Sequence, residues 1–584
     1  MVFVSPAWVP QLPTSLPDSI TVGDYLLDEA YGRCPASQSK APFTCGISGK
    51  AYSVEEVRKR VDYLARGLAK DLNWHPNEGS EWDKVVAIFS ANTIDTLTVT
   101  WATHRLSGIS APSNAQYTVG ELERQMKSSG CKAIFTCLPL LQTSIEAAAK
   151  SGLPMNHIYI IDLPVQLTGG AKAPPNFKTV DILITEGSVL EPLEALRWTK
   201  GQGATQTAFL CTSSGTSGRP ASAKVSHRNT IANIMQIFVY ESVARRRRGG
   251  QGPEVCLGLL PFSHSFSLVA VGHASVYAGD GVIILPNFDM QVLLGAVQNF
   301  KIESLYLIPP ILVALAKNPN LLKMYDLDSV TSIVSGAAAL SPDVMNTLQS
   351  LKPSWKIRQG YGLTEASVVM SFTSMDDIWS GSCGCLLPSV EARLLSSDGA
   401  EIESHGIAGE LLLRSPSIMM GFLNEDEATS SAISKDGWLK TGDVAMIKVS
   451  PNGTEHLFIV DRVKDIITVK GLQVAPTELE GHLLSHPAVL DCAVIPILDE
   501  TSGELPKAFV IKSPAASSDD DATLSQSIHA YLEPLVAPYK YLKGGIEFVA
   551  AIPKNASGKI LKNELKAAEE AKALHKPVQV YSFD

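Results

Sequence analysis

Basic residues are in the minority in this chain of 584 residues. Lysine and arginine together number 49, against 59 aspartates and glutamates, which gives a formal net charge of −10. A protein that binds nucleic acid usually carries a basic surplus on one face, where it neutralises phosphates. We therefore expect no nucleic-acid partner. The run of four arginines at 245–248 precedes a glycine-rich segment, which predicts an exposed loop.

Cysteine pairs at the spacing of a metal site are lacking. The nine cysteines are scattered from Cys34 to Cys492, and no two of them form a CxxC pair. An odd number of scattered cysteines in a long chain is typical of a reducing compartment, not of a scaffold held by disulfides. Cys383 and Cys385 alone do not make a zinc site.

Uninterrupted hydrophobic runs of membrane-spanning length are also lacking. Segment 256–279 has no formally charged residue, but a proline, serines, histidines and glycines interrupt it. This pattern favours a buried strand, turn and helix over a membrane span. The first residues lack the basic and apolar regions of a signal peptide, and the last four differ from the peroxisomal Ser-Lys-Leu signal. We expect a cytoplasmic protein without stable membrane insertion.

Short apolar runs alternate with helical patterns in the first half of the chain. Runs at 85–89 and 133–135 flank a helical stretch at 96–105, an order that predicts α/β layers with much parallel sheet. In the second half, runs at 409–414 and 456–460 are bounded by glycine and polar turns, which predicts antiparallel or barrel-like sheet.

The chain becomes charged at 461–465, and a helix start follows at Pro476. We predict an α/β fold with a large N-terminal domain of layered mixed sheets, helices and a barrel-like part at 1–460. A hinge at 461–464 would connect it to a small α+β domain at 465–584.

The strongest local motif is Ser-Ser-Gly-Thr-Ser-Gly-Arg-Pro at 213–220, directly after an apolar run at 208–211. Backbone N–H and hydroxyl groups in such a loop can hold a polyphosphate; the alternative is a flexible linker. A helix that Asn229 could cap follows, so the loop would be pinned between a strand and a helix. The GK[ST] sequence of P-loop NTPases is absent, which disfavours that class.

This loop resembles that of the adenylate-forming superfamily, which includes acyl-CoA synthetases, coumarate:CoA ligases, luciferases and peptide-synthetase adenylation domains. Further segments similar to the family's motifs follow in the family's order, and the resemblance spans nearly the whole chain. These segments are at 260–264, 335–338, 359–366, 437–443, 461–465, 470–476 and 553–559.

The resemblance implies an ATP site. The Tyr361 ring would stack on adenine, Asp443 would accept the ribose hydroxyls, and Arg462 would be a second ribose or phosphate contact. Thr364 would bond phosphate and Glu365 would hold Mg²⁺. The remaining ATP- or AMP-binding positions are Thr212, Ser213, Ser214, Gly215, Thr216, Ser217, Gly218, Gln359, Gly360 and Gly362.

Catalysis in this family requires no protein nucleophile, because the substrate carboxylate itself attacks the α-phosphorus of ATP. Lys559 matches the family's catalytic lysine and would neutralise charge at that phosphate. After adenylate formation the mobile small domain would rotate about Lys464. Lys470, Gly471 and Gln473 would then face the adenylate for transfer to coenzyme A. ATP, Mg²⁺ and coenzyme A are the expected cofactors and co-substrates.

Two positions depart from the family's pattern. The loop continues Pro-Ala-Ser-Ala where relatives usually have Pro-Lys-Gly, so the phosphate lysine is either absent or replaced by Lys224. Thr468 occupies a position where coumarate:CoA ligases tend to carry a lysine. The second departure bears on the thioester step and on the identity of the thiol acceptor.

The acyl pocket is expected around His264, which matches the family's aromatic-and-histidine segment. Its walls are small and apolar without a basic residue, which favours an aromatic or medium-chain monocarboxylic acid. The expected wall residues are Phe262, Phe266, Ser335, Gly336, Ala337 and Ala338. Three alternatives stay open: an acyl-AMP ligase that loads a carrier protein in trans, a luciferase-like oxidation, and a degenerate nucleotide-binding scaffold.

Overall fold

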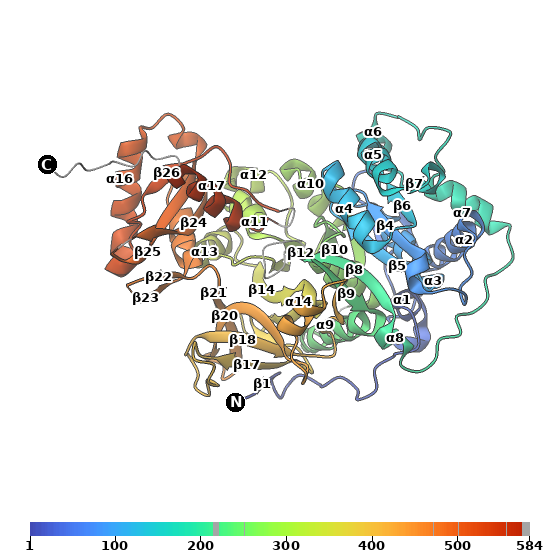
Figure 1. The fold of residues 1–584 in the computed structure, drawn as a ribbon, viewed down its shortest axis with the longest axis horizontal. Helices are drawn as coiled ribbons and strands as arrows, with labels where there is room; N and C mark the ends of the chain where they lie inside the picture. Colours follow the sequence, from blue (N-terminus) through green and yellow to red (C-terminus); the bar gives the residue numbers. More distant parts are fainter. Residues whose placement is uncertain (214–220, 250–251, 471, 500, 556–557, 575–584) are drawn as a thin grey trace.

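The computed structural model describes residues 1–213, 221–249, 252–470, 472–499, 501–555 and 558–574. The chain forms a large part that contains three sheets and a smaller C-terminal part built on a fourth (Figure 1). In Figure 1 the smaller part lies at the left, in orange to red, beside helices α11 (Pro309–Ala316) and α13 (Pro342–Leu351). The predicted α/β class with a small C-terminal domain is confirmed.

The first sheet of the large part has the strand order β19-β9-β8-β5-β4-β6-β7. Its central strands are parallel and buried along their length, as expected for continuous apolar runs covered on both faces. The strands are β4 (Val85–Phe89), β5 (Ile109–Ser113), β6 (Ala133–Thr136), β7 (Ile158–Ile160), β8 (Thr207–Ser213), β9 (Ala221–Ser226) and β19 (Gly421–Phe422).

The second sheet has the order β16-β15-β14-β13-β12-β10-β11-β2-β3 and is parallel from β14 to β2. Its strands are β2 (Phe43–Cys45), β3 (Ala51–Tyr52), β10 (Val255–Gly258), β11 (Gly281–Ile284), β12 (Ser304–Leu307), β13 (Ser332–Ser335), β14 (Lys356–Leu363), β15 (Val368–Phe372) and β16 (Cys385–Leu386). The two large sheets are packed through a shared apolar core.

The third sheet is antiparallel, as the glycine-bounded runs predicted. Its order is β1 (Phe3–Val4), β17 (Glu391–Leu395), β18 (Gly409–Arg414), β20 (Leu439–Val449) and β21 (Glu455–Arg462). The C-terminal part has the order β23 (Leu472–Val474), β22 (Ile467–Val469), β25 (Gly503–Lys512) and β24 (Val489–Asp499), with β26 (Ile546–Phe548) paired to β25.

Helices connect these strands and cover the sheets. The remaining helices of the large part are α1 (Val22–Leu27), α2 (Val54–Leu72), α3 (Thr96–Arg105), α4 (Val119–Ser129), α5 (Leu141–Ser151), α6 (Val165–Thr168), α7 (Val180–Ser188), α8 (Gln202–Thr205), α9 (His227–Arg247), the π-helix η5 (Phe266–Ser275), α10 (Met290–Phe300), α12 (Pro319–Leu322) and α14 (Asp426–Ala432). The C-terminal part carries α15 (Pro476–Leu484), α16 (Asp521–Leu532) and α17 (Lys562–Leu574).

Short 3₁₀ helices lie between these elements, at η1 (Glu29–Tyr31), η2 (Glu81–Lys84), η3 (Leu138–Leu140), η4 (Met155–His157), η6 (Thr364–Ala366), η7 (Pro514–Ala516), η8 (Glu533–Leu535) and η9 (Pro538–Lys540).

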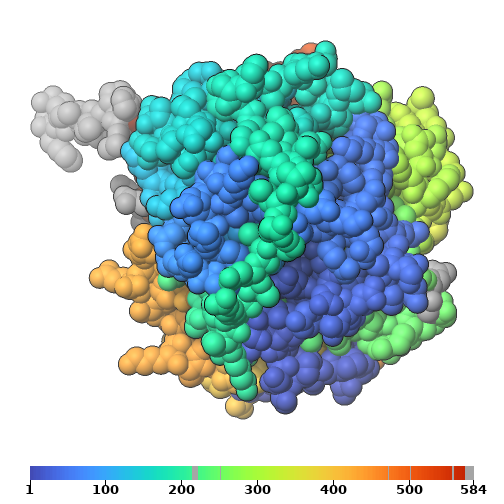
Figure 2. Space-filling view, turned by 90° about the vertical axis from the view of Figure 1, so that its right-hand side faces the viewer, coloured from blue at the N-terminus to red at the C-terminus, as the bar shows by residue number. Residues whose placement is uncertain are grey.

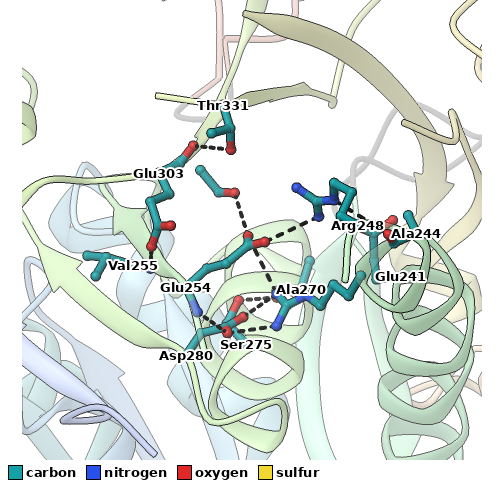
Figure 3. A network of polar contacts seen from close by, with 12 residues as sticks. Glu241, Ala244, Arg248, Glu254, Val255, Ala270, Ser275, Asp280, Glu303 and Thr331 are labelled. Atoms are coloured by element: carbon teal, nitrogen blue, oxygen red, sulfur yellow. Dashed lines mark hydrogen bonds and ion pairs between the residues drawn. The ribbon is translucent and has the colours of Figure 1, made fainter. Parts of the chain in front are cut away.

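The sequence predicted an exposed loop for the arginine run at 245–248, and this prediction is wrong. Helix α9 continues to Arg247, and Arg245 donates two hydrogen bonds to the Asp280 carboxylate, at 2.8 and 2.6 Å. Figure 3 shows this buried network, in which Glu254 also contacts Arg248. A distant acidic partner thus extends the helix, and no local pattern reveals it.

The start of α9 also differs in detail from the prediction. Ser226 is the N-cap residue, and Asn229 lies three residues later, where its side chain completes a capping box. Both residues satisfy backbone groups of the first turn, and the helix therefore begins at His227, before the cap that the sequence predicted.

An extended segment at 189–200 runs over the face of the large part that is turned to the viewer in Figure 2, where it appears as a green band on blue. Arg66 and Arg105, from α2 and α3, donate to its backbone carbonyls. Within the described residues, no helix is long and apolar enough to cross a membrane. The cytoplasmic location stays a prediction.

Candidate active site

A cavity of about 1120 Å³ lies where the large part meets the C-terminal part. Strands β14, β20 and β21, the π-helix η5 and the loop before α17 all contribute to its wall. It brings together most of the residues that the sequence predicted for the site. These are Thr212, Ser213, His264, Phe266, Gly336, Ala337, Ala338, Gln359, Gly360, Tyr361, Gly362, Thr364, Glu365, Asp443, Arg462 and Lys559.

Strand pairing positions the predicted nucleotide contacts. Asp443 on β20 lies opposite Arg462 on β21 in the register, and the two side chains form an ion pair at 3.4 Å. The Tyr361 hydroxyl donates to the other oxygen of Asp443, at 2.6 Å. Burial raises the pKa of Asp443, while Arg462 and Tyr361 oppose the rise. The result is a fixed acidic acceptor beside an aromatic ring, an arrangement that suits a nucleoside.

Glu365 and Thr364 lie in η6, directly after β14. The Ser213 hydroxyl at the end of β8 donates to the Glu365 carboxylate, and the Thr364 hydroxyl is 3.1 Å from that of Ser265. The strand that precedes the Gly/Ser loop is thereby joined to the predicted metal ligand. The described residues hold no group of three or more acidic, histidine or cysteine side chains that could bind a metal ion unaided.

Lys559 enters the cavity from the C-terminal part. Burial first, and then the charge of Arg462, lower the pKa of the Lys559 ammonium to about 8, although Asp443 and Glu365 act in the opposite direction. Burial and the charge of Lys559 likewise lower the pKa of His264 to about 4. At neutral pH the cavity therefore holds a lysine cation beside a neutral imidazole.

Gly558 explains how this lysine comes so close to the large part. Its φ is +79°, and a Cβ atom added there would lie 2.8 Å from Cδ1 of Ile308 and 3.3 Å from Cγ of Pro310. The backbone N–H of Lys559 donates to the Asn555 side chain at 2.9 Å, which shapes the turn. A close backbone approach thus positions the cation.

Two predicted acyl-pocket residues do not line the cavity. Phe262 is 2% exposed, and its backbone N–H donates to Asn92 in the core. Ser335 is 1% exposed at the end of β13, so its side chain is enclosed, and only the next residues, from Gly336 onward, reach the cavity. The alternation of strand and turn decides which member of a motif faces the ligand.

The residues predicted for the thioester step lie away from the cavity. Lys470 and Gln473 are exposed near the turn between β22 and β23, and Gln473 pairs with Thr468 across the ladder. Lys464 follows β21, and its pKa is lowered by burial and then by Arg462. Predicted residues Ser214, Gly215, Thr216, Ser217, Gly218 and Gly471 lie outside the described residues.

Lys224, which the sequence offers as a replacement for the missing phosphate lysine, lies outside the cavity wall in this arrangement. It lies on β9, where it pairs with Gly421. Burial raises the pKa of the Glu81 carboxyl, and hydrogen bonds from Thr207 and the charge of Lys224 oppose the rise.

Sequence reasoning missed the contacts that hold the two parts together. The Lys317 ammonium donates to the Val489 carbonyl at 2.6 Å, and the Ser485 hydroxyl donates to the Asp343 carboxylate at 2.6 Å. It also missed the deep wall residues Ile237, Tyr306 and Phe372. These residues belong to ordinary apolar stretches that contain no motif, so no signal in the sequence could have identified them.

Comparison with protein families decides the assignment. The profile of the AMP-binding enzyme family matches residues 34–423, and that of the AMP-binding enzyme C-terminal domain matches residues 478–559. The chain belongs to the AMP-binding enzyme family. The resemblance stated from the sequence motifs is therefore confirmed.

Full-length relatives of this AMP-binding enzyme are named acyl-CoA ligases. The chain is 44% identical to the acyl-CoA ligase easD of Emericella nidulans, with 97% of this chain and 100% of that protein covered. It is also 44% identical to the acyl-CoA ligase cm3C of Cordyceps militaris, over 97% and 90% of the two chains. These matches confirm the predicted enzyme class, an acid–thiol ligase.

Solved structures have the same fold. The anthranilate CoA ligase AuaEII in complex with anthranoyl-AMP superposes with a TM-score of 0.78 at 23% identity, covering 96% of this chain and 99% of that one. A benzoate CoA ligase from Burkholderia xenovorans superposes with a TM-score of 0.74 at 18% identity, covering 94% and 99%. These likenesses bear on the fold alone.

Proposed function

We propose that this protein uses ATP to convert a carboxylic acid into its acyl-adenylate and then transfers the acyl group to coenzyme A. In the first step the substrate carboxylate attacks the α-phosphorus of ATP, and the bond to pyrophosphate breaks. In the second step the thiol sulfur of coenzyme A attacks the acyl carbonyl, the proton of the thiol is lost, and AMP leaves. The full-length relatives named as acyl-CoA ligases support this reaction.

One observation carries the proposal for the first step: Lys559 lies in the same cavity as Asp443, Arg462 and Glu365. Asp443 and Tyr361 suit the nucleoside, so the phosphates would extend toward the Gly/Ser loop that follows Ser213. A buried lysine cation can then neutralise negative charge that develops at the α-phosphate during attack. Neutral His264 can orient the substrate carboxylate without competing for that charge.

The residues present fit a magnesium ion. Mg²⁺ is usually held by one or two carboxylates together with substrate phosphates, not by a protein cage. Glu365 is a carboxylate on the cavity wall, next to the Thr364 hydroxyl. When bound, the ion would neutralise phosphate charge and favour the departure of pyrophosphate. Ser213 would keep the Glu365 carboxylate oriented through its hydrogen bond.

The substrate that we propose is an aromatic or medium-chain monocarboxylic acid. The wall beyond His264 includes Phe266, Ala270, Val334 and Phe372, which are apolar side chains from the core of the large part. Burial of an aromatic ring or an alkyl chain against such a wall is favourable, whereas a second carboxylate would lose its hydration without gaining a cation.

For the second step we propose that the C-terminal part rotates about a hinge at 461–464. The arrangement described here places Lys559 at the cavity and leaves Lys470 and Gln473 exposed. The thiol needs access to the carbonyl that Lys559 covers, so the parts must rearrange between the steps. Asp461 joins the hinge to the C-terminal part in this arrangement, because it accepts from the Thr477 backbone at the start of α15.

The test is acid-dependent release of pyrophosphate from magnesium-ATP, with aromatic acids and straight-chain acids from butanoate to dodecanoate, with and without coenzyme A. Mass spectrometry would identify the product. We expect an acyl-CoA thioester from at least one acid. Adenylate without thioester would indicate a carrier protein as the acceptor, and no turnover with any acid would contradict the proposal.

Two variants separate the half-reactions. We expect Lys559→Ala to abolish most adenylate formation and Gln473→Ala to slow mainly the transfer to coenzyme A. Adenylation is measured by ATP–pyrophosphate exchange, and transfer by supplying the preformed acyl-adenylate with coenzyme A. Equal losses of both half-reactions in both variants would contradict the division of roles.

A further inference from the structure

The acyl end of the cavity is an apolar chamber inside the large part. Helix α9, the π-helix η5 and strands β12, β13 and β15 build its wall. The side chains that face it include Ile237, Phe266, Ala270, Tyr306, Val334 and Phe372. Almost every group in this wall can offer only van der Waals contact, so a single polar atom there has a large influence on which ligands fit.

The hydroxyl of Tyr306 is such an atom. It forms no hydrogen bond with any other residue in the described part of the chain. The Tyr25 and Tyr52 hydroxyls are enclosed in the protein, whereas Tyr306 lines the cavity. Two other tyrosines differ: Tyr361 donates to Asp443, and Tyr240 donates to the Phe372 carbonyl at 2.6 Å. The Tyr306 hydroxyl therefore retains its hydrogen-bonding capacity for a molecule in the chamber.

Phe266 lies between Tyr306 and the reactive end of the cavity, since it contacts both Tyr306 and His264. Its ring meets the Phe266 ring edge to face, with centroids 6.3 Å apart. Phe266 in turn follows His264 by two residues, and its backbone N–H donates to His264 Nδ1. An acid with its carboxylate near His264 and Lys559 would pass Phe266 before it reached Tyr306. The Tyr306 hydroxyl would thus contact the part of the acyl group that is remote from the carboxylate.

Paired charges lie next to the wall of this chamber, and Figure 3 shows those of Asp280 and Glu254 close to Ala270. Arg245 forms an ion pair with Asp280, whose carboxylate is 4% exposed. Arg358, which is 3% exposed, donates to Glu241 and lies over the Phe372 ring. The hydroxyl of Ser275 in this network donates to the carbonyl of Ala270, which lines the chamber. Each of these arginines already has a carboxylate partner, so none is left to receive an anionic group of the substrate.

Burial and these charges determine the protonation state of Tyr306. Burial, and then the nearby Cys256, Glu241 and Asp280, raise the pKa of Tyr306, so its hydroxyl stays protonated. A protonated phenol both donates and accepts a hydrogen bond. Its matching partner is a neutral oxygen atom, because a second carboxylate would lie close to Glu241 and Asp280.

We propose that Tyr306 makes this enzyme select carboxylic acids that bear a neutral oxygen substituent, a hydroxyl or keto group, remote from the carboxylate. The inference rests on the proposed function. An unsubstituted acyl group would dehydrate the Tyr306 hydroxyl and leave it unpaired, whereas an oxygen substituent would restore its hydrogen bond. Sites that hydrogen-bond a substrate hydroxyl discriminate against analogues that lack it for this reason.

The experiment compares acids with the same skeleton by ATP–pyrophosphate exchange. The pairs are cinnamate with 4-hydroxycinnamate, and octanoate with its 3-, 5- and 7-hydroxy and keto derivatives; octanedioate is the anionic comparison. One neutral hydrogen bond corresponds to a preference of about tenfold in kcat/KM. We expect that preference for at least one oxygenated acid and none for octanedioate.

Tyr306→Phe removes only the hydroxyl. We expect it to bring the ratio of oxygenated to unsubstituted acid close to one, because the oxygenated acid alone loses a hydrogen bond. Tyr325→Phe is the matched control, because Tyr325 does not line the cavity, and it should retain the wild-type ratio.

The outcomes separate the two proposals. Equal turnover of oxygenated and unsubstituted acids by the wild type would overturn this inference and leave the ligase function intact. A preference that persists in Tyr306→Phe would also overturn it. Absence of pyrophosphate exchange with every acid would instead overturn the proposed function on which it rests.

Discussion

The depressed pKa of Lys559 predicts that the rate of adenylation depends on pH, which can be tested directly. Burial and Arg462 lower this pKa to about 8, and the proposed neutralisation of the α-phosphate would require the protonated form. The cation is fully present below that pKa and is lost as the pH rises through it. We therefore expect kcat/KM for adenylate formation to decline on the alkaline side of about pH 8.

The size of the decline follows from the titration. One pH unit above the pKa only about a tenth of the lysine is protonated, so kcat/KM should fall about tenfold for each further unit. Bound ATP adds negative charge near the ammonium, which favours its protonated form. The alkaline limb of kcat should therefore lie at higher pH than the limb of kcat/KM.

The assay is ATP–pyrophosphate exchange without coenzyme A, from about pH 6.5 to 10, so that ionisation of the thiol plays no part. Lys559→Arg is the informative variant, because a guanidinium remains charged throughout this range. It should be slower but should lack the alkaline limb. A wild-type profile that is flat to pH 10, or a limb that persists in Lys559→Arg, would refute the reasoning.

Further predictions concern the contacts around the site. Arg245→Met should lower the free energy of unfolding by about 3 kcal/mol, because it leaves the buried Asp280 carboxylate unpaired. Urea denaturation would measure the loss. The double variant Arg245→Met with Asp280→Asn should recover part of it. Ser485→Ala removes a hydrogen bond of 2.6 Å between the two parts. It should slow adenylation up to about fivefold without slowing transfer from supplied adenylate. Equal slowing of both steps would contradict a role of Ser485 in holding this arrangement. Gly558→Ala places a Cβ 2.8 Å from Ile308 at a positive φ. It should reduce adenylation more than tenfold, while the far-ultraviolet circular dichroism spectrum stays unchanged. Adenylation at the wild-type rate would show that the close approach is dispensable.

Much of the fold was predictable because its signals are local. The runs at 85–89 and 409–414 have the predicted strand bounds, and the helix predicted at 96–105 has its predicted ends. The arginine run at 245–248 was misread because Asp280, 35 residues away, decides its structure. A charge run that lacks local partners looks solvated until the fold supplies a distant one.

The candidate site was predictable where residues belong to motifs with a chemical role. Asp443, Arg462, Glu365 and Lys559 were named from the sequence, and all of them line one cavity. Phe262 and Ser335 were named from the same kind of motif but are enclosed in the core. A motif specifies a turn or strand end, whereas the direction of each side chain depends on the surrounding packing.

The sequence by itself determined the family and the reaction class, and it predicted the residues that would meet the nucleotide, because those residues need particular chemical groups at particular spacings. Only the tertiary structure decided which face of the acyl chamber is polar, which contacts hold Lys559 at the cavity, and which arginines are buried. Tyr306, Ser485 and Asp280 have these roles through neighbours that are distant in the chain. Such contacts arise from packing between elements, and no local pattern of residues encodes them.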